Sequence, residues 1–366
     1  MNILVIKSRH IGDVLLTGPL LSTLRLRHPE SHITALVKTG TEAMLTGHPH
    51  IDMVITFPVR QPGEGQVEFL IRQWFWLRQL RCRRPDLVVN TTEGDRGAIA
   101  SLFSGGIQRV GWRGRKGNKW WRRGMLTQTM LFQGGIRHTI LHNLDLVGEG
   151  AQDRHVRLVF SATDVAQVEQ RLRDAGWNGG RPLVQIHPAS RWRFKCWTVS
   201  GMAGVADCLS QRGCQVILTA SPDAGERELV AAIAQACRHP VINLGGALTL
   251  KELAALSARC RLFFGVDTAP MHMAAALNIP VVALFGPSGT YDWGPWPNGW
   301  SGDGSPFSRT HGVQESFPHL VIQKTWPCGP CGKAGCEESK RSRCLEELEL
   351  AEVLPLLEGV LQREGL

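Results

Sequence analysis

The sequence predicts an α/β protein with two doubly wound parallel-sheet domains, and three observations predict it. The chain has 366 residues, which is more than one typical hydrophobic core organises. Short apolar runs typical of buried strands alternate with helical patterns over residues 1–90. The same alternation returns after residue 180, so a second sheet of the same kind is expected, with helices on both faces.

Four strands are expected in the first half of the chain, at 3–6, 33–37, 53–57 and 87–90. After the first strand a polar loop ends at Gly12, and Asp13 opens a Leu-rich helix that Pro29 ends. A second, amphipathic helix over 66–84 carries three consecutive aromatic residues among five arginines. This succession of strands and helices predicts the first parallel sheet.

Residues 109–123 interrupt the pattern and are expected to form a loop. They include seven lysines and arginines, three tryptophans and no acidic residue. Such a segment suits phosphates or an anionic lipid surface, with the Trp rings at headgroup depth, and RNA binding by stacking is an alternative. A surface loop whose tryptophans pack locally explains the same composition without a ligand.

The second half is expected to hold strands at 183–186, 214–218, 241–244, 262–266 and 281–285. Helical patterns lie before and between them, at 163–176, 201–211, 224–237 and 249–259. An acidic, Leu-rich helix over 345–364, interrupted at Pro355, is predicted to follow.

Composition is that of an ordinary soluble globular protein, with 43% hydrophobic and 20% charged residues. No uncharged apolar stretch reaches the ~18 residues that a membrane-spanning helix needs. The first strand-like run, Ile3–Ile6, has no apolar leader or cleavage site before it. We therefore expect no signal peptide and a cytoplasmic location.

Positive charge is concentrated in the first half of the chain. The formal net charge is +9, and residues 1–160 include 22 Lys and Arg against 12 Asp and Glu. This excess suits an acidic partner such as a phosphorylated substrate, an anionic membrane surface or a nucleic acid. A solvated basic surface with no specific ligand is the more common explanation.

The junction around Asp267 is the most informative stretch of the second half. The apolar run 262–266 ends on this acid, and Thr268, suited to cap a helix, and Pro270 open an Ala-rich helical segment. Asp267 would then lie at the carboxyl edge of a sheet, and His272 would lie one turn into the helix, beside N–H groups that suit a phosphate. A capped helix with a buried histidine explains the same residues without a ligand.

Common nucleotide-binding signatures are absent from the sequence. No G-x-G-x-x-G follows the first strand and no G-x-x-x-x-G-K-[ST] occurs, which argues against a dinucleotide dehydrogenase and a P-loop enzyme. No D-x-D pair is present to hold a metal ion for a sugar nucleotide. A diphosphate would then be neutralised by lysines, arginines and helix N-termini, and no catalytic metal or cofactor is expected.

Six of the ten cysteines stand singly in apolar or helical contexts, as buried reduced thiols do. The other four form a C-x2-C-x4-C-x7-C cluster: Cys328, Cys331, Cys336 and Cys344. The first pair has the spacing of a zinc knuckle, so a structural zinc site is one interpretation. The later spacings differ from those of a common zinc finger, so free thiols or a packing turn are the favoured interpretation.

Three short motifs resemble those of the ADP-heptose:lipopolysaccharide heptosyltransferases. Residues 9–19 carry the R-x-x-G-D-x-x-x-x-x-P pattern that opens this family, residues 267–272 its D-x-x-x-x-H motif and residues 285–288 its F-G-P-[TS] loop. The cysteine cluster also occurs in many members. The matches follow in order over nearly the whole chain, and within the family the sequence most resembles the subgroup that adds a branch heptose to the inner core.

The resemblance implies a GT-B fold, in which two Rossmann-like domains face a cleft. It implies an acceptor-binding domain at 1–155, a nucleotide-sugar-binding domain at 156–344 and a C-terminal helix, 345–366, that crosses back to the first domain. It implies an inverting, metal-independent transfer of L-glycero-D-manno-heptose from ADP-heptose to a heptose of the phosphorylated lipopolysaccharide core. The enzyme would be cytoplasmic, bound peripherally to the inner membrane, with no nucleic acid as partner.

The resemblance also implies catalytic roles for two residues. Asp13 matches the proposed general base, which takes the proton from the attacking acceptor hydroxyl. Lys195, in a K-x-W segment, matches the lysine that holds the donor phosphate and stabilises the charge on departing ADP. Without a catalytic role, Asp13 would only cap its helix, and Lys195 would be an exposed lysine between aromatic residues.

Further residues are predicted to bind the two substrates. Asp267 matches an acid that hydrogen-bonds the heptose hydroxyls, and Asp223 matches a ribose-contacting acid, although the usual G-G-P before it is Ala-Ser-Pro here. The other donor positions are Ser190, Leu244, Gly245, Leu248, Thr268, Ala269, His272 and Ser288. The predicted acceptor or membrane contacts are Arg9, Arg113, Arg115, Lys116 and Lys119.

Two other functions stay open at the level of the sequence. One is a GT-B transferase that moves a different sugar. The other is a non-catalytic basic protein that keeps a nucleotide-binding fold and binds membranes or RNA. The joint presence of Asp13, Lys195, Asp267 and His272 argues against the second.

Overall fold

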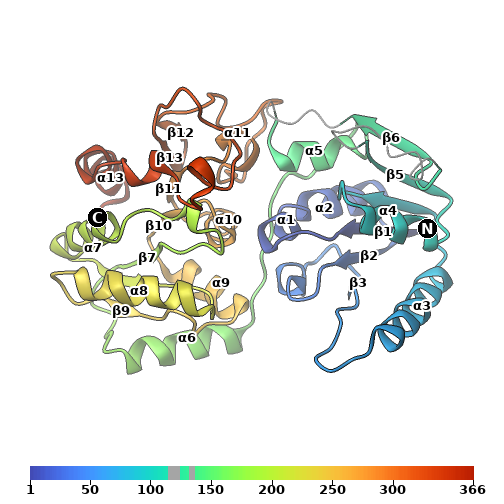
Figure 1. Cartoon of the computed structure of the whole chain (residues 1–366), viewed down its shortest axis with the longest axis horizontal. Coiled ribbons are helices and arrows are strands. Elements are labelled where there is room, and N and C mark those ends of the chain that lie inside the picture. The colour runs from blue at the N-terminus through green and yellow to red at the C-terminus, as the bar shows by residue number, and fades with distance from the viewer. Residues whose placement is uncertain (114–123, 132–136) are drawn as a thin grey trace. The chain divides into compact units, whose positions relative to one another are not determined.

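The structure is a computed structural model that describes residues 1–113, 124–131 and 137–366. The chain forms two compact units, Met1–Val159 and Phe160–Leu366. Figure 1 shows each unit as a sheet accompanied by helices. The two predicted parallel-sheet α/β architectures are confirmed, and the roles predicted for the two domains stay predictions.

The first unit is built on a six-stranded sheet in which all paired strands run parallel. In order across the sheet the strands are β3 (Met53–Thr56), β2 (His32–Val37), β1 (Asn2–Lys7), β4 (Leu87–Asn90), β5 (Gln108–Arg113) and β6 (Gln128–Leu131). The middle strands β1 and β4 have neighbours on both sides, and their apolar residues are buried apart from Leu87, which is half-buried. Such continuous burial is typical of parallel sheets covered on both faces.

Helices of the first unit cover this sheet. Among the described residues they are α1 (Ile11–Leu15), α2 (Gly18–Arg27), the 3-10 turn η1 (Glu42–Met44), α3 (Gln66–Cys82), α4 (Asp95–Phe103) and α5 (Thr139–Asp145). Leu4 and Ile6 of β1 pack with Leu80 of α3 and Ala100 of α4. Since alternate residues of a strand point to the same face, α3 and α4 cover one face of the sheet.

The single helix predicted from Asp13 to Pro29 is wrong, because the chain forms two helices with a break at Leu16 and Thr17. Pro19 lacks an N–H group, and its ring would clash with the carbonyl group of Leu15 in a continuous helix. Thr17 Oγ1 donates a hydrogen bond to the carbonyl of Asp13 at 2.9 Å. Asp13 therefore lies in a short helix of its own, close to the end of β1.

The loop predicted over 109–123 is also partly wrong, because residues 108–113 form strand β5 between β4 and β6. Val110 and Trp112 are buried in the sheet. The side chain of Arg109 donates hydrogen bonds to the carbonyls of Gly106, Gly124 and Met125. The buried Val110 and Trp112 alternate with Arg109, Gly111 and Arg113, and the abundance of positive charge favoured the prediction of a loop. Residues 114–123 lie outside the described part of the chain.

The second unit is built on a seven-stranded sheet. In order across it the strands are β12 (Gln314–Ser316), β13 (His319–Gln323), β11 (Val281–Phe285), β10 (Leu262–Val266), β7 (Leu183–His187), β8 (Gln215–Leu218) and β9 (Ile242–Asn243). Only β12 pairs antiparallel to its neighbour. The hairpin β12–β13 is absent from the prediction, although β13 is an apolar run and is fully buried.

Helices pack on both faces of the second sheet. The helices and 3-10 turns of this unit are α6 (Ala162–Asp174), η3 (Arg193–Lys195), α7 (Val199–Gln211), α8 (Ala224–Ala236), α9 (Leu250–Arg259), α10 (Ala269–Ala276), α11 (Thr290–Trp293), η4 (Cys336–Glu338), α12 (Arg343–Glu346) and α13 (Leu350–Glu364). Val184 and Ile186 of β7 pack with residues of α7, α8 and α13. Leu183 of the same strand packs with residues of α6 and α9.

The predicted interruption of the last helix at Pro355 is wrong. Pro355 lies inside α13, and the break comes earlier, between α12 and α13. Glu349 and Glu352 form a capping box that fixes the start of α13 at this point. Val353, Leu357 and Leu361 of α13 are fully buried in the core of the second unit. No helix in the described ranges has both the length and the apolar character needed to cross a membrane.

Candidate functional site

The predicted donor residues lie along one edge of the second sheet. Strands β11, β10, β7, β8 and β9 are consecutive neighbours and run parallel, so their carboxyl ends share that edge. Each of these strands is followed by a predicted donor position: Ser288, Asp267, Ser190, Asp223 and Leu244. The carboxyl edge of a parallel sheet is the usual place of a ligand in such folds.

Asp267 and Lys195 form a largely buried ion pair at this edge. Lys195 Nζ lies 2.5 Å from Asp267 Oδ2, and the two side chains are 22% and 7% exposed. Asp267 follows β10 directly, and Lys195 ends the turn η3 in the loop after β7. Because β7 and β10 are paired, this loop reaches the end of β10. The structure thus brings two of the predicted residues into direct contact.

Ser288 and His272 complete a polar cluster around the Asp267 carboxylate. Burial raises the pKa of Asp267, but the charge of Lys195 and hydrogen bonds from Lys195 and Ser288 oppose this effect, and His272 acts in the same direction as Lys195. The net result is a pKa below the usual value of 3.8. Asp267 is therefore a carboxylate at neutral pH, able to accept hydrogen bonds from sugar hydroxyls.

The Ser288 loop is held from the neighbouring strand β13. Gln323 Nε2 donates hydrogen bonds to the carbonyl oxygens of Gly286 and Ser288, at 2.6 and 2.9 Å. Sequence reasoning missed Gln323. The available signal was a polar residue that closes an otherwise apolar, strand-like run. Its contacts give it a positioning role for the loop.

The start of α10 differs in one respect from the prediction. Thr268 occupies the position before the helix and Pro270 its first turn, as expected. The Thr268 hydroxyl does not cap the helix but donates to the carbonyl of Val266 at 3.2 Å. Thr268 and Ala269 nevertheless lie at the helix N-terminus directly after Asp267, and His272 is buried one turn further on. A donor diphosphate placed here would meet first-turn N–H groups.

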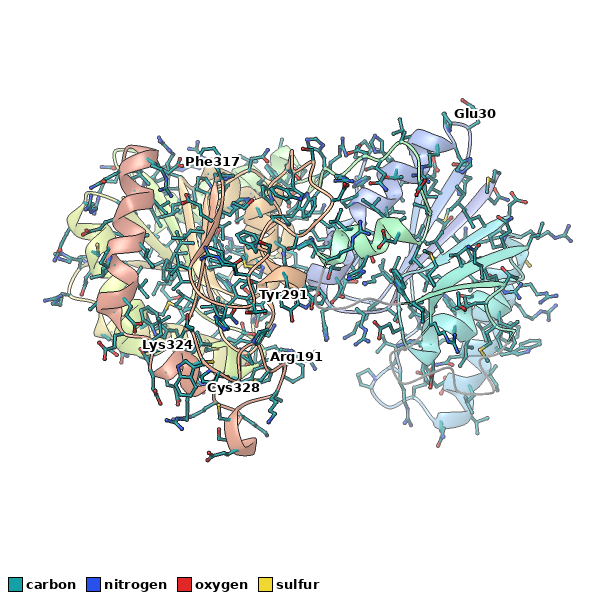
Figure 2. The ribbon with its side chains drawn as sticks, turned by 90° about the horizontal axis from the view of Figure 1, so that it is seen from above. Glu30, Arg191, Tyr291, Phe317, Lys324 and Cys328 are labelled. Carbon is teal, nitrogen blue, oxygen red and sulfur yellow. The ribbon has the colours of Figure 1, made fainter. Side chains whose placement is uncertain are left out.

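The loop after β7 carries Ser190 and, besides Lys195, the cations Arg191 and Arg193. Ser190 Oγ accepts a hydrogen bond from the N–H of Trp192 at 3.2 Å. The guanidinium of Arg191, labelled in Figure 2, lies 5.3 Å from the centre of the Trp192 ring. Lys195 is the residue of this loop that contacts Asp267. The loop therefore presents positive charge beside the carboxyl edge.

The predicted nucleoside end lies at the ends of β8 and β9. The Leu244 N–H donates to the carbonyl of Leu218, which keeps the two chain segments together beyond the short strand β9. Gly246 has a positive φ of 76°, and a Cβ there would lie 3.3 Å from the Cα of Pro222. Gly245 precedes this turn, and Leu248 is half-buried after it. The structure therefore brings the predicted adenine segment beside the loop of Asp223.

Asp223 has a structural contact of its own. Its Oδ1 accepts hydrogen bonds from the N–H groups of Gly225 and Glu226, at 2.9 and 3.2 Å, and so caps α8. The residue is exposed. Helix capping explains its position without a ligand, and its predicted contact with ribose stays a prediction.

In the first unit, Asp13 lies beside a buried lysine at the end of β1. Lys7 Nζ is 3.4 Å from Asp13 Oδ1, and the two side chains are 7% and 14% exposed. Lys7 also donates to the carbonyl of Thr91. Sequence reasoning did not select Lys7, although a lysine that ends an apolar strand is a recognisable signal. The pair gives the predicted base a fixed place at the carboxyl end of the central strand.

The predicted acceptor residues are only partly described. Arg9 is exposed in the loop between β1 and α1, and Arg113 is exposed at the end of β5. Arg9 follows the carboxyl end of β1 and Arg113 is the last residue of β5, although β1 and β5 are not neighbours. Arg115, Lys116 and Lys119 lie outside the described residues. The acceptor role of these residues stays a prediction.

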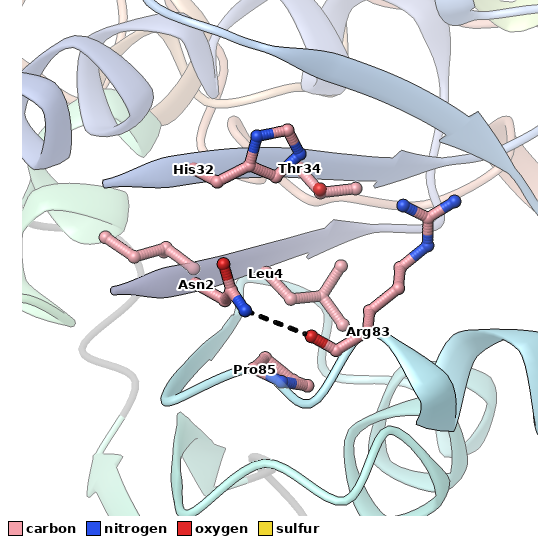
Figure 3. Close-up of a pocket in the computed structure, with 7 residues that line it drawn as sticks. Asn2, Leu4, His32, Thr34, Arg83 and Pro85 are labelled. Atoms are coloured by element: carbon pink, nitrogen blue, oxygen red, sulfur yellow. Dashed lines mark hydrogen bonds between the residues drawn. The ribbon is translucent and has the colours of Figure 1, made fainter. Parts of the chain in front are cut away.

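A cavity of about 140 Å³ in the first unit lies away from these residues. Figure 3 shows Asn2, Leu4, His32, Thr34 and Arg83 around it, and Asn2 Nδ2 donates to the carbonyl of Arg83 at 3.3 Å. These residues mark the amino ends of β1 and β2 and the chain before β4, whereas Asp13 follows the carboxyl end of β1. None of the predicted site residues lines this cavity.

The four clustered cysteines line one small cavity of the second unit, together with Lys324 and Trp326. Figure 2 labels Cys328 and Lys324. Burial and the three neighbouring cysteines raise the pKa of the Cys344 thiol to about 11. Within the described ranges, no three His, Cys, Asp or Glu side chains are placed to hold a metal ion. The structural zinc site stays a prediction, which metal analysis of the purified protein tests.

Residues 74–311 match the family described as glycosyltransferase family 9 (heptosyltransferase). The lipopolysaccharide heptosyltransferase 3 of Escherichia coli is 31% identical over 81% of this chain and 87% of its own length. The protein of the same name from Escherichia coli K12 is 29% identical over 86% of this chain and 92% of its own length. Each of these two matches covers most of this chain and most of the relative.

Solved structures show the same fold. The glycosyl transferase family 9 protein of Veillonella parvula superposes with a TM-score of 0.79 at 20% identity, over 99% of this chain and 97% of that one. The ADP-heptose lps heptosyltransferase II of Escherichia coli gives a TM-score of 0.76 at 22% identity, over the full length of both chains.

Proposed function

The chain belongs to glycosyltransferase family 9 and has a GT-B fold, and on that premise we propose that it transfers L-glycero-D-manno-heptose from ADP-heptose to the lipopolysaccharide inner core. The acceptor group is a hydroxyl of a core heptose. The relatives named lipopolysaccharide heptosyltransferase 3 support this choice of substrates. The observation that carries the proposal is the cluster of Lys195, Asp267, His272 and Ser288 at the carboxyl edge of the second sheet.

The donor sugar and diphosphate occupy this edge. Asp267 accepts hydrogen bonds from heptose hydroxyls, while the N-terminus of α10 and the ammonium of Lys195 face the diphosphate. Lys195 has three N–H donors, so it can keep its contact with Asp267 and still donate to a phosphate oxygen. The adenosine extends toward the ends of β8 and β9.

The reaction is a single displacement. The acceptor oxygen attacks the anomeric carbon, the bond from that carbon to the phosphate oxygen breaks, and ADP leaves with the electron pair. The Asp13 carboxylate takes the proton of the acceptor hydroxyl, and Lys195 stabilises the charge that develops on ADP. Attack from the side opposite ADP inverts the anomeric configuration. Because cationic side chains and helix N–H groups supply the positive charge, we propose that no metal ion takes part.

Purified protein, ADP-heptose and a core acceptor that lacks the branch heptose test the proposal. We expect the acceptor to gain one heptose by mass spectrometry, with product of inverted configuration by NMR and equal rates with and without EDTA. Strict dependence on a divalent ion would contradict the metal-free mechanism. Transfer from other nucleotide sugars but not from ADP-heptose would favour a GT-B transferase for a different sugar.

The acceptor is a membrane lipid, so we propose that the protein works at the cytoplasmic face of the inner membrane as a peripheral protein. The net positive charge of residues 1–160 supports this location, because the membrane surface and the phosphorylated core are both anionic.

A further inference from the structure

The outward face of α3 carries an unusual row of apolar side chains. Val67, Leu70, Ile71, Trp74 and Phe75 are between 52% and 72% exposed. They follow one another at the spacing of a single helix face. Large apolar side chains gathered on one exposed face are typical of an interaction surface, whereas single exposed ones are ordinary.

This row is not the face that holds α3 on its own unit. The opposite face provides Leu80, which is 2% exposed in the core beneath the sheet. It also provides Trp76, whose ring lies 5.5 Å from that of Phe57. Positions 76 and 80 are one helical turn apart and point toward β1, β2 and β4. The helix is thus already anchored, and the outward row adds nothing to the core.

Arginines continue the outward face toward the end of α3. The Arg78 guanidinium lies 4.8 Å from the centre of the Trp74 ring, and Arg81 and Arg84 are exposed beyond it. Two acids are close in sequence. Glu64 is bound by Arg72 at 2.8 Å, and Glu68 is exposed in the first turn. An apolar row followed by a basic end therefore remains after this pairing.

We propose that this face of α3 docks the first unit on an anionic lipid surface. Helices with apolar side chains on one face and arginines beside them lie in the interface, with the apolar residues among the acyl chains and the arginines at the phosphates. Trp74 beneath Arg78 is suited to the headgroup boundary. At 17 residues α3 is about 25 Å long, and it lies along the surface rather than across it. This proposal rests on the proposed function, in which the enzyme acts on an acceptor that lies in a membrane.

Sedimentation with vesicles tests this surface without any assay of transfer. The full chain should bind vesicles of phosphatidylglycerol and phosphatidylethanolamine more tightly than vesicles of phosphatidylcholine. The triple substitution Leu70→Gln, Trp74→Gln and Phe75→Gln should weaken binding by at least ~10-fold, because three large apolar side chains lose their place among the lipids. The matched control is Leu26→Gln, which changes an exposed apolar residue of α2 (52% exposed) and should leave binding unchanged.

Charge is tested separately. Arg78→Gln should weaken binding to the anionic vesicles about fivefold and leave binding to phosphatidylcholine unchanged. Equal binding of the triple variant and the unchanged protein would overturn the proposal. So would a dimer in solution that the triple variant converts to monomers, because a second copy would then be the occupant of this face.

Two acceptor formats separate this proposal from the proposed function. With a soluble, deacylated core acceptor the triple variant should retain kcat and KM. With the acceptor embedded in vesicles its apparent KM should rise by about the factor lost in vesicle binding. The unchanged protein could show no transfer activity in either format while the triple substitution still weakens vesicle binding. That result would support the docking face and contradict the proposed function. An unchanged KM on vesicles would overturn the docking face alone.

Discussion

Asp13 and Lys195 carry opposite charges and belong to different units, so substituting them should disturb different steps. Asp13→Asn removes the proposed base but keeps an oxygen beside Lys7 Nζ, which lies 3.4 Å from the carboxylate. We expect turnover to fall about 100-fold or more while affinity for ADP, measured by calorimetry, stays the same. Lys195→Ala should instead weaken ADP binding, because it removes the cation that faces the diphosphate.

Thermal unfolding controls for damage to the fold in this comparison. Lys195→Ala leaves the buried Asp267 carboxylate without its ammonium partner and should lower the melting temperature. Adding Asp267→Asn removes that charge and should restore the melting temperature but not the ADP affinity. A large loss of ADP binding in Asp13→Asn would show that Asp13 acts on the donor side or holds the structure.

Sequence motifs predicted site residues that lie close together in the chain. The contacts between residues of different motifs are seen only in the fold. Asp267 and His272 belong to one motif, but only the pairing of β7 with β10 places Lys195 on Asp267. Gln323 was missed because it acts through a contact between segments far apart in the chain. Lys7 is close to Asp13 in sequence, but only the turn from β1 into α1 brings the two side chains together. The roles of the predicted residues in binding and catalysis remain predictions.

At the scale of elements, β10 has no room for a side chain at its glycine. A Cβ on Gly265 would lie 2.6 Å from the carbonyl oxygen of His187 on the neighbouring strand. Gly265→Ala should therefore destabilise the second unit by about 1–3 kcal/mol, because backbone atoms must move apart. Chemical denaturation measures the change.

The same substitution in α13 serves as the control. A Cβ on Gly359 would meet no atom within 4 Å, and alanine is the better helix former by about 0.5–1 kcal/mol. Gly359→Ala should therefore stabilise the unit slightly. Equal effects of the two substitutions would show that the contact with His187 does not limit β10.

Strands with continuous apolar runs were predictable, and helix ends were less so. β10 and β11 have the predicted bounds, because a run of buried residues is read directly from the sequence. The predictions at two prolines were wrong in opposite ways. Pro19 separates two helices where one was expected, and Pro355 lies inside α13, where an interruption was expected. The effect of a proline depends on packing around it, and that packing is set by distant residues.

For the whole molecule, buried histidines make stability depend on pH. Burial lowers the pKa of His187 to about 4 and that of His319 to about 3, from 6.5. Between these values and about 6.5 the unfolded chain binds more protons than the folded chain, so lowering the pH favours unfolding. Stability is fully present above about pH 6.5 and is lost as the pH falls toward 4, by about 3 kcal/mol for His187.

Melting temperatures measured from pH 8 to pH 4.5 check this expectation. The His187→Gln variant should show a flatter decline below pH 6.5, whatever its melting temperature at neutral pH. His155→Gln is the control, because that ring is 55% exposed in the first unit and should leave the decline unchanged. A decline of equal slope in the His187→Gln variant would mean that other groups govern the response.

The packing of α13 sets an order for folding during synthesis. Val353, Leu357 and Leu361 fill a core whose other members begin at Val184, so this core closes only after residue 361 has left the ribosome. The first unit needs only residues 1–159 and is ready to fold much earlier. Until α13 arrives, the apolar surface it covers on α7 is open to chaperones and to other nascent chains.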